Sequence, residues 1–353
     1  MQNNHIQRYA KNPIISISDV KPTKDNMEVV GVFNCGGVLY SGKIYLLCRV
    51  SEIIKPKSKD IISIPIMTNK GLTEISYNKN DINLDFSDSR SIRDDNNKIL
   101  NLTSFSSLRL AISNDGYNFQ IDEKPCISID PITENWGIED PRIAKIDNTF
   151  YITYSSVSQN GVGVSLATTK DFKKFNKLGL ILPPTNKDTV IFPEKINNKF
   201  YLLHRPSPFD NLGNSDIWLA ESNDLLHWGN HKHLCGSKEG NVWEALKIGA
   251  GSTPIKIDEG WLVFYHGVDK NERYCMGYLL LDKNDPSKIL FRTKNPIMEP
   301  TMNYEKSGFF SETIFPCATI PTMNKIIMYY GAADNSICRA DIEINKLREL
   351  RNE

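Results

Sequence analysis

The sequence carries no excess of charge of either sign. Its 42 basic side chains are matched by 42 acidic ones, so the formal net charge at pH 7 is zero. Nucleic acids and anionic membranes attract proteins through a positive field, which this chain lacks. We therefore expect neither a nucleic acid nor a membrane as a partner.

Long apolar stretches are also missing. No run approaches the roughly 18 apolar residues of a membrane span, and the opening segment MQNNHIQRYAKNPIIS lacks the apolar region of a signal peptide. The seven cysteines are odd in number and include no C-x-x-C pair, which argues against a disulfide framework and a structural zinc site. We expect a cytoplasmic protein with reduced thiols and no metal.

Sustained helical periodicity is absent as well, whereas strand and turn formers are plentiful. The chain has 14 Tyr, 15 Phe, 18 Pro and 21 Gly, which favours strands joined by turns. One unit recurs, in which a short strand and a polar turn lead into a strand rich in aromatic and β-branched residues. Its five copies lie at residues 36–50, 140–157, 192–206, 252–268 and 315–334.

A further strand follows each copy, so one repeat comprises about four short strands. Radial closure is how such antiparallel sheets protect their edges. The sequence therefore predicts an all-β fold, a five-bladed β-propeller that forms a single domain over residues 1–353. The first blade carries an insertion at about residues 52–100, rich in Lys, Asp, Asn and Ser. This insertion is either a solvated excursion or a lid over the site.

The motif WGIEDPRI, residues 136–143, supplies the candidate catalytic acid. Pro141 disfavours the helical region for Asp140, which places this carboxyl group at the start of an extended strand with Glu139 on the opposite face. Burial there would raise the pKa of Asp140, as a general acid near neutrality requires. The alternative is an ordinary Asp-Pro turn whose carboxylate bonds its own backbone.

Basic residues recur at the blade boundaries. They are Arg49, Lys187, His204, Arg205, Lys247 and His266. Several cations directed at one axis repel each other unless an anion lies between them, and phosphate suits guanidinium and ammonium donors. The alternatives are solvated or surface-paired strand ends and a neutral histidine that satisfies a backbone carbonyl.

Two other groups of residues could contact a sugar. Asn34 and Asp334 lie at corresponding axial places in the first and fifth blades, where short polar groups would suit hydroxyls. Four aromatic residues could stack on a sugar ring, although such residues more often belong to a core. They are Trp136, Trp243, Tyr265 and Tyr330.

Several motifs together resemble glycoside hydrolase family 130, the β-mannoside phosphorylases. They are EVVGVFNCGGVLYSGKIYLLCRV, WGIEDPRI, IFPEKINNKFYLLHRP, EALKIGAGSTPI, GWLVFYHGV and YYGAAD, and the resemblance runs from about residue 12 to residue 340. The family fold is a five-bladed propeller, so the resemblance implies the same fold.

The resemblance also implies roles for individual residues. It makes Asp140 the single general acid and assigns mannose binding to Asn34, Arg49 and Asp334. It places phosphate at Lys187, Arg205, Lys247 and His266. The first of these basic positions is commonly Arg in the family, so Lys187 would lose bidentate geometry. No cofactor is implied, because inorganic phosphate is a co-substrate, and family members often form homo-oligomers.

The implied reaction is a reversible, inverting phosphorolysis of a β-mannoside that yields α-mannose 1-phosphate. Asp140 would act through the 3-hydroxyl of the mannosyl unit while phosphate attacks the opposite face. The segment from NPIISISDVKP through EVVGVFNCGG is most similar to the branch that acts on β-1,2-linked mannobiose and oligomannan. The alternatives are a β-1,4-mannosyl-glucose or mannooligosaccharide phosphorylase, an inverting β-mannosidase with Glu244 as base, and a non-catalytic glycan-binding propeller.

Overall fold

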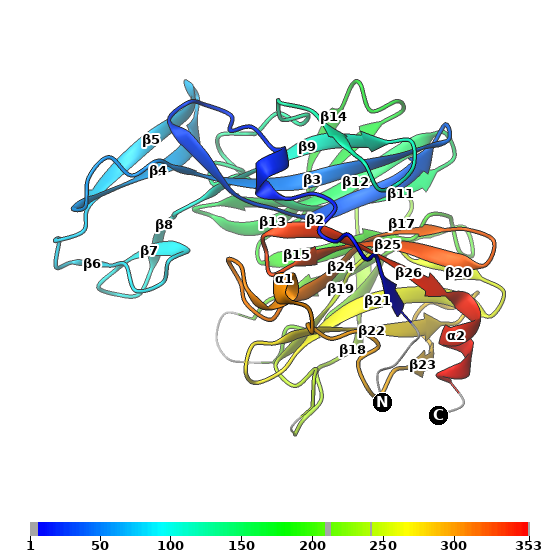
Figure 1. Cartoon of the computed structure of the whole chain (residues 1–353). Coiled ribbons are helices and arrows are strands. Elements are labelled where there is room, and N and C mark those ends of the chain that lie inside the picture. Colours follow the sequence, from blue (N-terminus) through cyan, green and yellow to red (C-terminus); the bar gives the residue numbers. More distant parts are fainter. Residues whose placement is uncertain (1–5, 209–212, 241, 352–353) are drawn as a thin grey trace.

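The computed structural model describes residues 6–208, 213–240 and 242–351, which form five antiparallel sheets that are the blades of a propeller (Figure 1). The innermost strand of each blade contacts its neighbours around the ring. β2 contacts β11 and β24, β15 contacts β11 and β19, and β21 beside β19 contacts β24. The predicted five-bladed propeller is confirmed.

The blades follow one another along the chain, each from its innermost strand outward. The first two comprise β2 (Met27–Tyr40), β3 (Lys43–Ile54), β9 (Phe105–Ser113) and β10 (Gln120–Ile121), then β11 (Ile138–Ile146), β12 (Thr149–Ser158), β13 (Gly161–Thr169) and β14 (Asn176–Leu182). The third and fourth comprise β15 (Asn186–Ile191), β16 (Phe200–Pro206), β17 (Ile217–Ser222) and β18 (Gly229–Cys235), then β19 (Lys247–Ala250), β20 (Ile255–Ile257), β21 (Gly260–Val268), β22 (Tyr274–Leu281) and β23 (Ile289–Arg292).

The fifth blade takes its strands from both ends of the described chain. β24 (Ile314–Pro321), β25 (Lys325–Ala332) and β26 (Ser336–Glu343) come from the last repeat, and β1 (Ile6–Arg8) adds the outermost strand by pairing antiparallel with β26 (Figure 1). The sequence did not predict β1. Pairing with β1 covers the outer edge of β26, which would otherwise present unpaired backbone groups.

Helices are few and short in the described ranges: η1 (Ile17–Asp19), α1 (Asn303–Lys306) and α2 (Ile344–Glu349). Among the described residues, no helix has the length and apolar character that crossing a bilayer requires.

Apolar side chains fill the contacts between neighbouring blades. The described residues form five buried clusters, and each cluster combines side chains from two adjacent blades. Between the second and third blades, for example, Leu166 and Leu202 are fully buried. Each blade has a neighbouring blade on either side, so both faces of its sheet are buried. Because strand side chains alternate between the two faces, the strands need apolar residues at successive positions, as the repeated Val, Ile, Leu and Tyr of the sequence provide.

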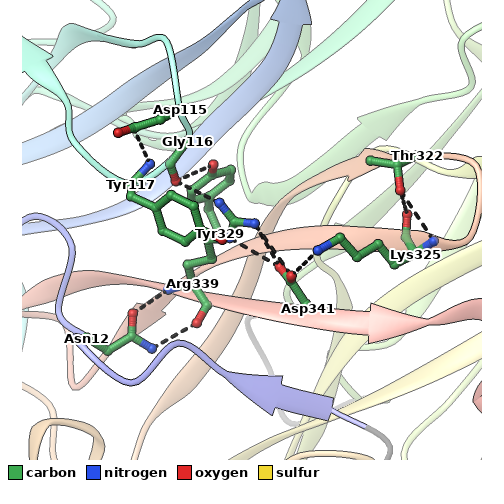
Figure 2. Close-up of polar contacts among 9 residues, drawn as sticks. All are labelled: Asn12, Asp115, Gly116, Tyr117, Thr322, Lys325, Tyr329, Arg339 and Asp341. Atoms are coloured by element: carbon green, nitrogen blue, oxygen red, sulfur yellow. Dashed lines mark hydrogen bonds and ion pairs between the residues drawn. The ribbon is translucent and has the colours of Figure 1, made fainter.

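A polar joint adds to the apolar contact between the first and fifth blades (Figure 2). Arg339 on β26 donates from Nη1 to the carbonyl of Gly116 in the first blade at 3.1 Å, and Tyr329 donates to the same carbonyl at 2.9 Å. The Arg339 guanidinium also lies 3.8 Å from the ring centre of Tyr117. Asn12 receives the Arg339 backbone N–H and donates to its carbonyl, each at 2.8 Å. These contacts fix a first-blade turn to the closing blade.

The first-blade insertion forms two small sheets that project to one side of the ring (Figure 1). They are the hairpin β4 (Ile61–Thr68) and β5 (Gly71–Asn78), and the strands β6 (Leu84–Asp85), β7 (Ser91–Asp94) and β8 (Ile99–Leu102). Trp136 donates its indole N–H to Asn101 at 3.0 Å, and the Arg90 guanidinium lies 5.5 Å from the ring centre of Phe310. The insertion is thus attached to the second blade and to the loop before β24.

Gly116→Ala should weaken the joint that closes the ring. Gly116 has φ +76°, and a Cβ there would meet Tyr329 Oη, Arg339 Nη1 and Ile44 Cδ1 at 2.8–2.9 Å. We expect the free energy of unfolding in urea to fall by about 3 kcal/mol, because a left-handed backbone and crowding both oppose the methyl group. Gly42→Ala is the matched control, with φ +76° but no atom within 4 Å, and should lose only about 1 kcal/mol. Equal losses in the two variants would contradict this account.

Candidate active site

A polar pocket of about 380 Å³ lies where the inner strands of the blades converge. Its wall contains all eight predicted site residues, contributed by all five blades: Asn34, Arg49, Asp140, Lys187, Arg205, Lys247, His266 and Asp334. The insertion also contributes to the wall through residues that include Asp88, Arg90 and Arg93. The structure therefore brings together polar groups that are dispersed along the chain.

Backbone irregularities aim several of these side chains into the pocket. Asn34, Asp140 and Asp188 have φ of +44°, +50° and +52°, and each lies in a bulge of the innermost strand of its blade. Asp334 has φ +49° in the three-residue turn between β25 and β26. Asn and Asp tolerate left-handed backbone better than other non-glycine residues, and bulges commonly redirect side chains at functional sites.

Asp140 lies within a hydrogen-bonded cluster that also contains a buried arginine. Asn34 Nδ2 donates to Asp140 Oδ1 at 3.0 Å, and Arg49 Nη1 donates to the same oxygen at 3.1 Å. Arg49 Nη2 donates to Glu139 Oε1 at 2.7 Å. The prediction that Glu139 faces away from Asp140 is therefore wrong. The bulge after Glu139 interrupts the alternation of the strand, and both carboxylates contact the same guanidinium.

The predicted rise in the pKa of Asp140 is also wrong. Burial raises this pKa, but the positive charges of Arg49, Arg142 and Lys187 outweigh burial, and the net pKa lies below the ordinary value of an aspartic acid. Asp334 behaves oppositely, because burial raises its pKa to about 6 despite the attraction of Arg49. A proton in the pocket therefore binds more readily to Asp334 than to Asp140.

The other side of the pocket carries the basic residues and a carboxylate. Arg205 Nε donates to Asp188 Oδ2 at 2.6 Å, and His266 Nε2 lies 3.7 Å from the same oxygen. Burial, followed by repulsion from Arg205 and Lys187, lowers the pKa of Lys247 to about 8. The cluster is therefore cationic at neutral pH, although Asp188 offsets part of its charge.

His266 belongs to this cluster as a neutral imidazole. Burial lowers its pKa to about 3. Asp188 acts in the opposite direction, but the positive charges of Arg205 and Lys247 lower the pKa further. Its ring lies between Phe315 and Tyr274, at centroid distances of 4.4 and 5.7 Å. The buried Nδ1 atom has no hydrogen-bond partner among the described residues. His266 therefore offers a hydrogen-bonding group to a bound molecule but no charge.

Comparisons with known proteins assign the chain to one family. A family model described as beta-1,4-mannooligosaccharide phosphorylase, glycoside hydrolase family 130, matches residues 98–353. Beta-1,2-mannobiose phosphorylase from Listeria innocua serovar 6a is 45% identical over 349 residues, which cover 97% of each chain. The chain belongs to glycoside hydrolase family 130.

Other family 130 proteins extend this similarity. The 1,2-beta-oligomannan phosphorylase of Thermoanaerobacter sp. strain X514 is 39% identical over 246 residues, 69% of this chain and 80% of that protein. The solved structure of the Listeria innocua enzyme in complex with beta-1,2-mannobiose has a TM-score of 0.94 at 44% identity and covers 99% of both chains. The predicted family 130 membership is confirmed, and the likeness includes β2 and β3 of the first blade, which lie before the residues that the family model matches.

Two sequence-based suggestions, His204 and Glu244, fail because their side chains lie outside this pocket. His204 is buried in a different contact, with Nδ1 bonded to Asn186 and Nε2 facing His231 at 3.0 Å. Glu244 is fully buried and accepts hydrogen bonds from Tyr265 at 2.6 Å and Arg292 at 2.7 Å. Glu244 is absent from the pocket wall, so it is not placed to activate water as a base.

The four candidate stacking aromatics are core residues rather than parts of the pocket wall. Tyr330 donates to Glu305 at 2.9 Å, and Trp243 donates to the carbonyl of Lys294 at 3.0 Å. The aromatic side chains that do line the pocket are Phe33, Tyr274, Phe309, Phe310 and Phe315.

Asp188 was not among the predicted site residues, although it lies directly after Lys187 and lines the pocket. A signal was present, since Asn34, Asp140 and Asp188 occupy comparable places at the beginning of three successive repeats. The pocket residues of the insertion had no such signal, because the insertion has no counterpart in the other repeats. Within the described ranges, no His, Cys, Asp or Glu cluster of three or more is arranged to hold a metal ion.

Lys247 should make the affinity for inorganic phosphate depend on pH. With a pKa of about 8, its ammonium group loses its proton as the pH rises through this value, and the cluster then loses one positive charge. We expect the Kd for phosphate, measured by calorimetry, to rise about tenfold between pH 7 and pH 9. Lys247→Met should bind phosphate more weakly at pH 7, and its Kd should not show this tenfold rise. Because phosphate titrates in the same way in both proteins, the variant controls for the titration of phosphate itself. A Kd in the unmodified protein that tracks the variant across this range would overturn the assignment.

Proposed function

We propose that this protein is an inverting phosphorylase of β-1,2-linked mannobiose or oligomannan. Inorganic phosphate is the co-substrate and α-mannose 1-phosphate the product. The observation that carries the proposal is a buried aspartate, Asp140, that faces Lys187, Arg205 and Lys247 in one pocket. Family 130 membership supports phosphorolysis of a β-mannoside. Relatives named as β-1,2-mannobiose and 1,2-β-oligomannan phosphorylases support the linkage.

The two sides of the pocket suit the two substrates. Asn34, Arg49 and Asp334 surround Asp140 and offer amide, guanidinium and carboxyl groups to a mannosyl unit. Lys187, Arg205, Lys247 and neutral His266 hold phosphate. Holding an anionic nucleophile in line with the anomeric carbon replaces the second carboxylate that an inverting hydrolase uses to activate water.

Asp140 supplies a proton in the bond-breaking step. Phosphate oxygen bonds to the anomeric carbon while the bond to the glycosidic oxygen breaks. That oxygen takes a proton from the 3-hydroxyl of the mannosyl unit, and the 3-hydroxyl takes the proton of Asp140. The carboxylate then regains a proton, and the proton count closes because the attacking phosphate gives up its own. Neither a metal nor an organic cofactor is needed for this chemistry.

Binding of phosphate prepares Asp140 for this role. The cations that lower its pKa include Arg142 and Lys187. An anion beside them offsets their positive charge, so the pKa of Asp140 rises when phosphate is bound. Bound phosphate thus favours the protonated form of Asp140 in the complex in which its proton is used.

The proposed cellular setting is the cytoplasm. The seven cysteines are unpaired thiols, which suits a reducing cytoplasm. A homo-oligomer stays a prediction from the family resemblance.

Asp140→Asn should abolish turnover while sugar binding persists. We expect the rate of phosphorolysis to fall at least about a thousandfold, because the amide has no acidic proton to transfer. The assay is release of mannose 1-phosphate from β-1,2-mannobiose with and without phosphate. Asp258→Asn, on an exposed turn away from the pocket, is the control and should keep full activity. Phosphate-independent release of mannose would show a hydrolase instead.

The pH profile should depend on phosphate concentration. Activity needs protonated Asp140, so it falls as the pH rises through the pKa of that group. Because bound phosphate raises this pKa, the alkaline limb measured at saturating phosphate should lie at higher pH than the limb measured well below KM. Rates on β-1,2-mannobiose across pH 5 to 9 at both concentrations test this. Superimposed limbs would show that phosphate does not control the acid.

A further inference from the structure

The anion side of the pocket, which carries Lys187, Arg205, Lys247 and His266, also contains a carboxylate, Asp188. A negative charge is unexpected among groups that attract an anion. Its side chain is 2% exposed and lines the pocket from a left-handed position in β15. On the neighbouring strand β19, a Cβ on Gly249 would collide with Asp188 Oδ2 and the ring of His266. The glycine thus lets the carboxylate pack closely, so its position is fixed by the fold.

The groups around Asp188 keep it ionised. Burial raises its pKa, but the positive charge of Arg205, followed by those of Lys187 and Arg142, outweighs burial and holds the pKa well below the usual range. The other charged groups near it are Lys247 and the Asp140 carboxylate. Asp188 Oδ2 contacts Arg205 Nε, whereas Oδ1 receives no hydrogen bond from the part of the chain that the structure describes.

A fully ionised anion beside this carboxylate would be repelled, and because the Asp188 side chain is only 2% exposed, water screens the repulsion poorly. A proton between the two oxygens removes the conflict and forms a strong O–H···O⁻ hydrogen bond. Inorganic phosphate keeps at least one P–OH group at neutral pH, whereas sulfate has lost both protons. The two anions are otherwise nearly equal in size and shape.

We propose that Asp188 makes the anion site selective for a protonated oxyanion, accepting a hydrogen bond from the P–OH of phosphate and disfavouring sulfate. This inference rests on the proposed function, which makes inorganic phosphate the anion. Asp188 thus weakens the binding of anions in general by repulsion, but it stabilises an anion that carries a proton by accepting a hydrogen bond from it.

The competing explanation is that Asp188 only orients the Arg205 guanidinium. In that case its removal would weaken phosphate and sulfate by the same factor. Selectivity between the two anions therefore separates the explanations, whereas loss of activity alone would not.

The test is calorimetric titration with sodium phosphate and sodium sulfate at pH 7 and constant ionic strength. We expect the protein to bind phosphate at least about a hundredfold more tightly than sulfate. In Asp188→Asn, whose amide can donate to sulfate, sulfate should bind more tightly than before and phosphate more weakly, so that the ratio falls below about ten. A ratio unchanged by Asp188→Asn would overturn the proposal.

Arg205→Lys is the matched control, because it removes the Arg205–Asp188 hydrogen bond but keeps both charges. It should weaken both anions and leave their ratio nearly intact, and a ratio that collapses in this variant would also overturn the proposal. If Asp188→Asn does not fold, the unmodified protein decides, since sulfate binding within about threefold of phosphate is incompatible with a proton-requiring site. Selective phosphate binding in a protein that does not cleave β-1,2-mannobiose would refute the proposed function alone.

Discussion

The pocket depends on charges that have been taken out of water and must therefore be compensated within the protein. A buried ion is stable only with close partners of opposite charge and good hydrogen bonds. Arg49 is held between Glu139 and Asp140 on the sugar side, and Arg205 is held by Asp188 on the anion side. Each half of the pocket thus has an arginine whose direction is fixed before any substrate arrives, which is the preorganisation that catalysis by positioning requires.

Two buried groups, Asp334 and Lys247, are not fully compensated by opposite charges, and their pKa values are shifted. Burial, together with the nearby Asp140 and Glu139, raises the pKa of Asp334 to about 6 despite the attraction of Arg49. Lys247 has no carboxylate within ion-pair distance among the described residues, and its pKa falls to about 8. Perturbed pKa values of this kind gather where a protein binds or transforms charged molecules. The sugar side is therefore ready to hold a proton and the anion side to receive negative charge.

Much of the architecture could be predicted because the repeats are visible in the sequence. Equivalent places in successive repeats must lie at the same end of the blades, so Asn34, Asp140 and Lys247 could be assigned to one pocket without knowing any distance. The alternation of side chains along a strand could also have separated two of the predicted basic residues. His204 and Arg205 are consecutive in β16 and must face opposite sides, and only Arg205 lines the pocket.

Other features depend on interactions that have no local pattern. Bulges redirect Glu139 and Asp140 toward the same arginine, and a single extra residue in a strand leaves little trace in composition. The lowered pKa of Asp140 follows from the summed field of cations on three blades. The pairing of β1 with β26 involves only three residues, Ile6–Arg8, too few for a recognisable strand pattern.

The shared fifth blade also has a consequence for how the protein acquires its activity during synthesis. Domains begin to fold while the chain is still leaving the ribosome, starting from the amino-terminal side. Here the outermost strand of the last blade is made first and must wait for β26, and the pocket needs Asn34 from the first blade beside Asp334 from the fifth. A partly translated chain can pack several blades yet hold no complete binding cavity. Catalytic competence should therefore emerge abruptly, when the final repeat docks against the first.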